Sequence, residues 1–344
     1  MEFTDLEKII LDRIQREFPL VRDPFFDMAQ ESSIGRDEFL ATARSLKERG
    51  IIRNISGIFN AGRLGYVSVL VAFQVDAGDV EHAAGIINSH PGVSHNYLRE
   101  HRYNIWFTVT AESEENLEKA VRYLSEKVNA ADYLLFRNVR MLKIGMILNI
   151  KGGTPHQGLE YPQPGAHGKS GVKILSQEEK EAIRLLQIDL PLVVDPFAYL
   201  IVTNNGMIPE DSLLEHSRRF KRKGIMRRYS AVLRHVKAGF IANAMTVWKY
   251  GQDVDIDHIA QIFFSRPMIS HLYLRSVYPG KWEYPLFAII HARSEGELDG
   301  IISDLSLESG LRDYQVLRTL REFKKERVVY NSQLFNDWER QAGI

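Results

Sequence analysis

The sequence predicts an α+β protein built as a tandem repeat, in which a winged helix-turn-helix unit followed by a ferredoxin-like βαββαβ unit occurs twice. Three observations predict this architecture. Motifs of the first half return in the same order in the second half, each half passes from helical apolar spacing to strand alternation, and a Gly- and Pro-rich segment separates the two halves.

The internal repeat rests on long motifs. FPLVRDPF, KERGIIR and SHNYLR of the first half return, slightly changed, at Leu190–Phe197, Lys221–Arg227 and Ser270–Arg275. Four residues near the end of each half also recur, as Tyr133, Arg137, Arg140 and Lys143 and then as Tyr314, Arg318, Arg321 and Lys324. Because the matches keep their order and small insertions explain the growing offset, we infer a duplication.

Composition narrows the class of protein. The 344 residues are 44% hydrophobic and 26% charged, as in ordinary globular proteins, and they could form two domains or four small ones. The absence of cysteine excludes disulfides, a thiolate nucleophile, an iron–sulfur cluster and cysteine-ligated zinc. The formal net charge is zero, so any basic surface must be local. With no long apolar run and no signal peptide, we expect a cytoplasmic protein that does not bind membranes.

The helical unit of the first half is predicted from its start. An apolar stripe at helical spacing predicts the first helix, with Leu6, Ile9, Ile10 and Ile14. Pro24 can begin a second helix, and a third should run over 36–49 and stop at Gly50. Residues 51–53 and 56–59 then suit the two strands of a small wing.

The αβ unit follows directly. Alternation from Val67 to Val75 predicts a half-buried strand. Ser113 is a plausible N-cap with two acidic residues after it. The later elements are expected as a helix over 79–89, strands over 93–98 and 103–110, a helix over 113–128 and a last strand over 134–148. This order is βαββαβ, with the helices on one face of the sheet.

Domain boundaries follow from this pattern and its repetition. We expect helix-turn-helix units at 1–62 and 173–236, αβ units at 63–150 and 237–330, a linker at 151–172 and a C-terminal tail at 331–344. His156 and His167 fall in the linker, and no partner stands at ligand spacing, so we expect solvated side chains there and not a metal site.

Two resemblances enter at this point. The layout of helix-turn-helix and βαββαβ is that of the Lrp/AsnC regulators, and residues 46–53 resemble the end of their recognition helix. More specifically, His95–Phe107 (HNYLREHRYNIWF) resembles the signature of one subunit type of the siroheme decarboxylases. Ser270–Arg275, with Lys281, Trp282, Tyr284, Pro285 and the segment 321–327, resembles the other type. The resemblance covers nearly the whole chain, apart from the linker and the tail.

The resemblance implies an activity. Siroheme decarboxylases remove two acetate carboxyl groups from siroheme and give 12,18-didecarboxysiroheme and CO2, which makes them carbon–carbon lyases of haem biosynthesis. They need no added cofactor, because the iron belongs to the substrate. Both subunit types would here be fused, so the two halves could form a pseudo-dimer within one chain. The sequence does not decide whether chains associate further.

The required chemistry matches the residues around the first signature. An acetate on a pyrrole ring can leave as CO2 once the ring accepts a proton at carbon, so the site needs a proton donor, cations for the other carboxylates and apolar walls. On a strand, His95, Tyr97 and Arg99 share one face, and His101 follows in a turn. We predict His101 as general acid and His95 as its partner or a carboxylate ligand. The expected substrate-binding residues are Tyr97, Arg99, Tyr103, Trp106, Arg137, Arg140, Lys143, His271, Tyr273 and Arg275.

The two halves differ at this site. His95 corresponds to His271, but His101 corresponds to Val277. We therefore hypothesise that the first half carries the acid, and that the second half is degenerate as a catalyst and completes the pocket. Each of these residues also has a structural interpretation, as a satisfied histidine, a core aromatic or a solvated cation. His291, in an apolar strand, could be a core residue or a lining residue, and we favour the core.

Two other functions compete with the decarboxylase. A DNA-binding regulator would use the basic third helix of the second half, with Arg218, Arg219, Lys221, Arg222, Lys223, Arg227 and Arg228. The matching helix of the first half is far less basic, and residues 203–209 would disturb a helix-turn-helix, so DNA is not the expected partner. A tetrapyrrole-binding sensor would share the same pocket without the chemistry.

Overall fold

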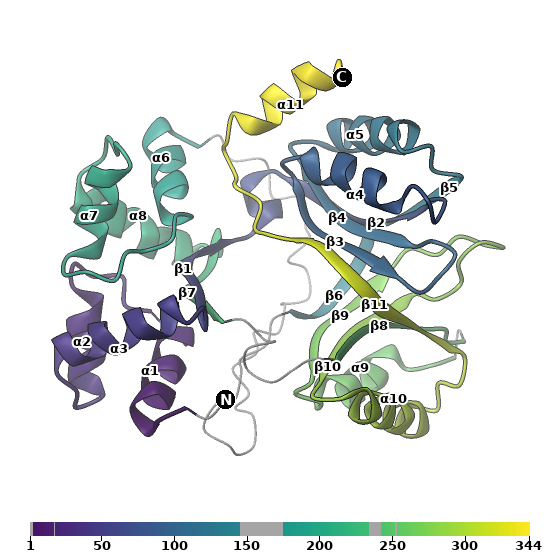
Figure 1. Ribbon diagram of the computed structural model, residues 1–344, viewed down its shortest axis with the longest axis horizontal. Coiled ribbons are helices and arrows are strands. Elements are labelled where there is room, and N and C mark those ends of the chain that lie inside the picture. The colour runs from purple at the N-terminus through teal and green to yellow at the C-terminus, as the bar shows by residue number, and fades with distance from the viewer. Residues whose placement is uncertain (1–2, 17, 145–174, 234–241, 252) are drawn as a thin grey trace.

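The computed structural model describes residues 3–16, 18–144, 175–233, 242–251 and 253–344 (Figure 1). The linker expected at 151–172, with His156 and His167, lies outside these residues. One side of the molecule is a helical layer, and the other is formed by β-sheets with helices on their outer faces (Figure 1). None of the described helices is long and apolar enough to cross a membrane.

The helical layer contains both helix-turn-helix units. Its helices are α1 (Asp5–Gln15), α2 (Pro24–Glu31), α3 (Arg36–Glu48), α6 (Gln177–Leu186), α7 (Pro196–Thr203) and α8 (Glu210–Arg222). Capping boxes begin the first helix of each unit, with Thr4 and Glu7 in α1 and with Ser176 and Glu179 in α6. Apolar side chains of both units share one core, so the two units pack together as a single body.

The expected two-strand wing is wrong. Each half has a single strand here, β1 (Ile52–Phe59) or β7 (Met226–Leu233), and the two pair antiparallel with each other. Residues 52–59 form one continuous strand with no turn for a hairpin, and its ladder hydrogen bonds are made across the pseudo-dimer. A short 3₁₀ helix, η1 (Ala61–Leu64), then leads into the first sheet.

The sheets have the predicted ferredoxin-like connectivity. The first contains β2 (Val67–Gln74), β3 (Val93–Arg99), β4 (Ile105–Ala111) and β5 (Asp132–Phe136), in the order β5-β2-β4-β3. The second contains β8 (Ala242–Trp248), β9 (Ile269–Arg275), β10 (Leu286–Ala292) and β11 (Tyr314–Lys325), in the order β11-β8-β10-β9. The helices α4 (Val80–Ser89), α5 (Glu114–Lys127), α9 (Ile256–Phe264) and α10 (Glu295–Ser309) cover the outer faces (Figure 1). Ser113 caps α5 as predicted, accepting a hydrogen bond from the Asn116 N–H.

The last strand of each half crosses to the other sheet. Residues 314–318 of β11 pair with β8 of their own half, and residues 319–325 pair with β3 of the first half. In the first half, the strand expected over 134–148 is divided into β5 and β6 (Asn138–Ile144), and β6 pairs with β9 of the second half. The division has a topological reason, because the chain passes from the first sheet to the second between β5 and β6 and changes its pairing partner there.

The inner faces of the sheets share a core. Ala72, Trp106 and Phe136 of the first half pack with Met245 and Phe287 of the second. The segment expected as a tail contains α11 (Leu334–Ala342), which packs on the outer face of the first sheet. The crossing strands and this shared core fix the two sheets to each other, and the functional site lies between them.

Candidate active site

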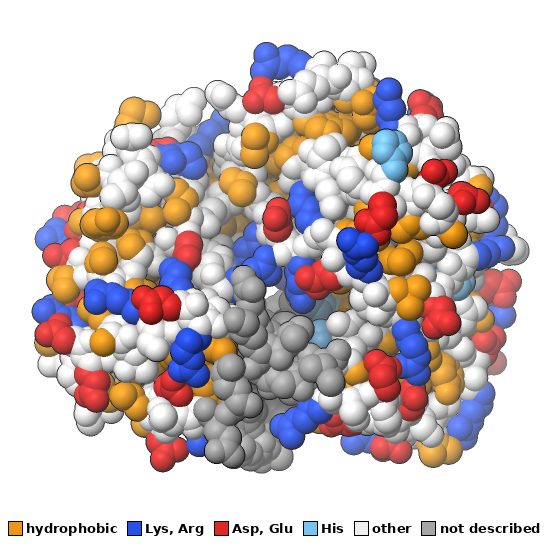
Figure 2. Space-filling model, in the orientation of Figure 1, with side chains coloured by type: hydrophobic (Ala, Val, Ile, Leu, Met, Phe, Trp, Pro, Cys, Tyr) orange, Lys and Arg blue, Asp and Glu red, His pale blue; other side chains and the backbone are white. Residues whose placement is uncertain are grey.

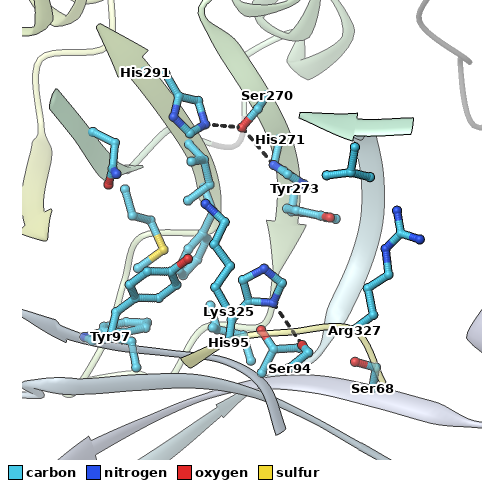
Figure 3. Close-up of a pocket in the computed structure, with 18 of the residues that line it drawn as sticks. Ser68, Ser94, His95, Tyr97, Ser270, His271, Tyr273, His291, Lys325 and Arg327 are labelled. Atoms are coloured by element: carbon cyan, nitrogen blue, oxygen red, sulfur yellow. Dashed lines mark hydrogen bonds between the residues drawn. The ribbon is translucent and has the colours of Figure 1, made fainter. Parts of the chain in front are cut away.

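A cavity of about 540 Å³ opens between the two sheets, within the size range of small-molecule sites (Figure 3). Side chains of β3 and β9 line it from opposite sides, and β1, β7 and the end of β11 contribute to its walls. Figure 2 shows Lys and Arg side chains at the edge of the hollow in the centre of this face, and histidine atoms inside it. The cavity therefore depends on both halves of the chain.

The repeated motif supplies equivalent groups from each half. Strand alternation turns His95, Tyr97 and Arg99 of β3 toward the cavity, as predicted, and its counterparts on β9 (His271, Tyr273 and Arg275) also line it. Each histidine is bound by the serine before it. Ser94 Oγ lies 2.9 Å from His95 Nδ1, and Ser270 Oγ lies 2.8 Å from His271 Nδ1.

Two arginines face the cavity, Arg99 buried and Arg275 half-buried. Arg99 is 5% exposed, and its Nη1 donates to the carbonyl oxygen of Leu317 at 2.9 Å. Arg275 Nη1 donates in the same way to the carbonyl oxygen of Phe136, also at 2.9 Å. Burial lowers the pKa of each arginine to about 10, so both carry their charge at neutral pH. Each guanidinium also lies over the tyrosine two residues before it, 5.1 Å from the Tyr97 ring and 4.6 Å from the Tyr273 ring.

Both guanidiniums have unused hydrogen-bonding capacity. The Nε atoms of Arg99 and Arg275 are buried, and neither has a hydrogen-bond partner within the described part of the chain. No carboxylate of the described residues forms an ion pair with either arginine. A buried charge without a counter-ion is unfavourable, so these two groups fit a site that receives anions.

The charge of the cavity has one sign. Its cationic side chains are Arg99, Arg228, Arg275, Lys325 and Arg327, and no Asp or Glu is among the described residues that line it. The whole chain has 44 basic and 44 acidic residues, so this separation is local. Burial, followed by the charges of Lys325 and Arg53, lowers the pKa of His95 to about 4, and His95 is therefore neutral at pH 7.

A third imidazole distinguishes the second half. His291 lines the cavity from β10, and its Nε2 lies 2.9 Å from Ser270 Oγ (Figure 3). The interpretation of His291 as a core histidine is thus wrong, and the second half adds an imidazole to the site. The hypothesis that the second half is degenerate therefore does not hold for the number of imidazoles that it brings to the cavity.

His101 does not line the cavity. It lies in the turn between β3 and β4, as predicted, but its Nδ1 accepts a hydrogen bond from the Tyr103 N–H at 3.0 Å. Its ring is stacked on Tyr103 and contacts Trp282 edge-on, with centroids 5.8 and 5.4 Å away. This local hydrogen bond and the aromatic contacts hold the ring at the end of the sheet.

Four further predicted residues also lie elsewhere or are not described. The Tyr103 hydroxyl donates to Asp132 at 2.8 Å and does not line the cavity. Arg137 pairs with Glu114 and Glu118, which raises its pKa, the hydrogen bond to Glu114 first. Arg140 pairs with Asp257 at 2.6 Å. The side chain of Lys143 lies outside the described part of the structure.

Trp106 does line the cavity, beside several residues that sequence reasoning missed. The missed residues include Ser94, Ser270, Asn243, Met245 and Arg327. The two serines precede the repeated histidines in both copies of the motif, so the repeat itself contained a signal for them. Asn243 and Met245 alternate along β8 like ordinary strand residues, and only the approach of the first sheet makes them part of a site.

The basic third helix of the second half contacts the helix-turn-helix unit of the first half. Arg218 donates to the carbonyl oxygen of Leu20 at 3.0 Å, and Arg219 pairs with Glu179 at 3.0 Å. On the equivalent helix of the first half, Arg44 donates to the carbonyl oxygen of Leu192 and Lys47 pairs with Asp189, both at 2.8 Å. Arg219 pairs within its own unit, whereas the contacts of Arg218, Arg44 and Lys47 join the two helix-turn-helix units and use cations that a DNA reader would present to phosphates.

Comparison with known proteins connects this geometry to a family. Residues 7–53 match the model of the siroheme decarboxylase NirDL-like HTH domain. Residues 63–143 and 237–324 match the model of the AsnC-like ligand binding domain, once in each half.

Relatives match over almost the full chain. A siroheme decarboxylase of Hydrogenobacter thermophilus is 38% identical over 335 residues, covering 96% of both chains. A siroheme decarboxylase NirDL subunit of Paracoccus denitrificans is 27% identical and covers 94% of this chain and 97% of its own. Among solved structures, the siroheme decarboxylase NirDL in complex with an iron-uroporphyrin III analogue is 33% identical, covers 98% of both chains and has a TM-score of 0.76.

Proposed function

The chain belongs to the siroheme decarboxylase family, and from this premise we propose that it converts siroheme into 12,18-didecarboxysiroheme by removing the carboxyl groups of two acetate side chains. The observation that carries the proposal is the cavity between the sheets, where imidazoles and guanidiniums gather without a carboxylate among the described lining residues. A flat substrate with many carboxylates needs such a site.

Substrate binding is assigned to the cations and the apolar walls of the cavity. Arg99 and Arg275 would each grip a carboxylate through their inward-facing guanidiniums, and Lys325 would contribute a third positive charge. Trp106, together with Phe287 on the opposite sheet, gives the cavity aromatic walls for the macrocycle. Binding would neutralise buried charge and release water from apolar surface at the same time.

The reaction needs one proton donor near the pyrrole ring. A proton added to a ring carbon turns the pyrrole into an electron sink, and the C–C bond to the carboxylate then breaks with its electron pair moving into the ring. The remaining exocyclic carbon takes up a proton and becomes a methyl group, while the ring proton is returned. The net change is one proton consumed and one CO2 released for each acetate, and this is a carbon–carbon lyase reaction.

The proton chemistry is assigned to imidazoles that line the cavity, His95 and His271, and not to His101. This choice is supported by geometry, because a general acid must come within hydrogen-bonding distance of the atom that it protonates. His101 would act indirectly, through its ring contacts with Tyr103 and Trp282 at the end of the sheet. No added cofactor is proposed, and the iron is part of the substrate.

Anaerobic incubation of the purified protein with siroheme, followed by mass spectrometry, tests the function. We expect two successive losses of CO2, and none with heat-denatured protein. Siroheme that stays bound without any loss of CO2 would identify a carrier or sensor instead. A sequence-specific mobility shift of DNA without turnover would identify a regulator.

A further inference from the structure

Ser270 connects two imidazoles at the cavity wall. Its Oγ lies 2.8 Å from His271 Nδ1 and 2.9 Å from His291 Nε2 (Figure 3). A hydroxyl has one hydrogen, so Ser270 can donate to one of these ring nitrogens while accepting an N–H from the other. The protonation states of the two rings are therefore coupled through Ser270, which is itself only 3% exposed.

The first half has no such chain of groups. Ser94 binds His95 as Ser270 binds His271, and the register places Thr108 opposite His95 and Ile289 opposite His271. Two residues further along each strand stand Thr110 in β4 and His291 in β10. Thr110 Oγ1 donates to Ser68 Oγ at 3.1 Å, so an aliphatic hydroxyl pair occupies the place of the third imidazole.

We propose that Ser270, His271 and His291 form a proton relay that supplies the decarboxylation from the second half of the chain, with His271 as the catalytic residue. His291 and Ser270 are positioning residues that act through His271. This inference rests on the proposed function and narrows the proton chemistry assigned there to His95 and His271 down to His271 alone. It also reverses the expectation that the first half carries the acid. His95 on the opposite wall would then bind a substrate carboxylate.

The relay moves one proton and leaves no ion behind on His271. It starts with His291 as an imidazolium, whose Nε2–H donates to Ser270 Oγ, while the Ser270 hydroxyl donates to His271 Nδ1. When His271 Nε2 gives its proton to a pyrrole carbon, the serine proton moves to His271 Nδ1 and the His291 Nε2 proton moves to the serine. All three groups are then neutral. The proton that the pyrrole carbon later gives back restores the relay, and the proton that completes the methyl group comes from solvent.

The asymmetry of the two walls supports this assignment. Direct donation by an isolated neutral imidazole would leave an imidazolate, which is highly unfavourable, whereas a relay with a second imidazole avoids it. His95, whose pKa is lowered by burial and by nearby cations, is neutral, and among the described residues its serine does not bridge to a second imidazole. A neutral His95 can still donate an N–H to a carboxylate.

The test compares the steady-state turnover of three variants under anaerobic conditions. We expect His291→Gln, which can still hydrogen-bond to Ser270 but cannot titrate, to lower kcat by about 100-fold or more, the usual contribution of general acid catalysis. Its affinity for siroheme, measured by absorbance titration, should stay close to that of the unmodified protein. Ser270→Ala should lose a similar factor in kcat, and Ser270→Thr should restore most of it.

The matched control is Ser94→Ala in the first half. It removes the equivalent serine–histidine hydrogen bond, and we expect it to weaken siroheme binding with a much smaller change in kcat than Ser270→Ala. The solvent isotope effect gives a second readout that a structural role would not move. A plot of kcat against the D2O fraction should be curved for the unmodified protein and linear for Ser270→Ala, because several protons move together only in the relay.

The outcomes separate the relay from the proposed function. A His291→Gln variant with unchanged kcat, or equal losses of kcat for Ser94→Ala and Ser270→Ala, overturns the relay while the decarboxylase stands. If the unmodified protein binds siroheme but releases no CO2, the proposed function fails first. Should His291→Gln not fold, the Ser270→Ala and Ser270→Thr pair and the isotope plots still decide.

Discussion

Arg99 and Arg275 show at the scale of single residues how this fold maintains a charged interior. Arg99 donates to the carbonyl oxygen of Leu317 and the hydroxyl of Thr319 on β11, and Arg275 donates to the carbonyl oxygen of Phe136 at the end of β5. Each keeps a buried Nε without a partner in the described chain. Such an arrangement costs stability in the empty protein, because desolvated charge is not fully compensated. The cost is understandable if an anionic substrate supplies the missing partners.

Conservative replacement of these arginines is therefore informative. We expect Arg99→Lys and Arg275→Lys each to weaken siroheme binding by about 10-fold, because the charge stays but the planar fork that holds a carboxylate by two hydrogen bonds is lost. Absorbance titration measures the dissociation constant. Arg137→Lys is the matched control, since Arg137 is engaged with Glu114 and Glu118 away from the cavity. An equal loss in that control would contradict the assignment of the cavity.

His90 gives stability a defined pH dependence. It is 2% exposed, its Nδ1 accepts a hydrogen bond from the Gly92 N–H at 2.9 Å, and burial, followed by the charge of Lys324, lowers its pKa to about 3. In the unfolded chain a histidine titrates near pH 6.5. The unfolded state therefore takes up a proton that the folded state refuses between these values.

The free energy of unfolding should accordingly fall as the pH drops from about 6.5 toward 3, by up to about 1.4 kcal/mol per pH unit from this residue. We expect His90→Asn, which can still accept the Gly92 hydrogen bond, to reduce the slope of stability against pH by about this amount in urea titrations at pH 6, 5 and 4. The exposed His82 on α4 offers a control, and His82→Asn should keep the original slope. Identical slopes for both variants would refute this origin.

At the scale of elements, the packing of side chains on the paired strands β1 and β7 depends on Gly57. A Cβ at this position would lie 2.9 Å from Met226 Sδ and 2.9 Å from the Phe59 ring. We expect Gly57→Ala to destabilise the protein by about 1–3 kcal/mol through overpacking. Gly85→Ala is the contrasting variant, because its Cβ would meet nothing within 4 Å and α4 should gain up to about 1 kcal/mol from the better helix former. Denaturation midpoints measure both, and a neutral Gly57→Ala would argue against tight packing.

The C-terminal helix α11 holds the outer face of the first αβ unit. The Trp338 ring lies 4.2 Å from the His90 ring and 5.5 Å from the Tyr123 ring, each edge-on. We expect Trp338→Ala to lower the free energy of unfolding by about 3 kcal/mol, since a large buried side chain is removed. Leu334→Ala on the same helix is 56% exposed and should change stability by less than about 0.5 kcal/mol. Equal effects would mean that α11 does not pack as described.

At the scale of the whole molecule, the two halves are interlocked. β6 completes the sheet of the second half, β11 joins both sheets, and β1 pairs with β7. One wall of the cavity comes from the first half and the opposite wall from the second, so neither half contains a complete site. We therefore infer that the exchanged strands can hold the two halves together without the covalent connection.

Cutting the chain within 151–172 tests this interpretation. When the two fragments are produced together, we expect them to copurify as a one-to-one complex that binds siroheme. Each fragment alone should aggregate or remain unfolded, because its crossing strand and its wall of the cavity lack a partner. Size-exclusion chromatography with absorbance at the siroheme band measures both results. A stable single fragment that binds siroheme would contradict the shared site.

The sequence by itself determined the repeated architecture and much of one wall of the site. The helical spacing around Ile10 and the alternation from Val67 to Val75 are local patterns in the sequence, and they can be recognised without knowing any tertiary contact. For the same reason, the shared face of His95, Tyr97 and Arg99 was predictable from strand alternation alone.

Only the tertiary structure decided which strands pair and which side chains meet. The pairing of β1 with β7, the crossing of β11 and the placing of His291 beside Ser270 join residues that are far apart in the chain or lie on different strands. The exclusion of His101 depends on a hydrogen bond within its own turn and on Trp282 from the other half. Such contacts are set by packing and register between distant segments, and a local pattern contains no information about them.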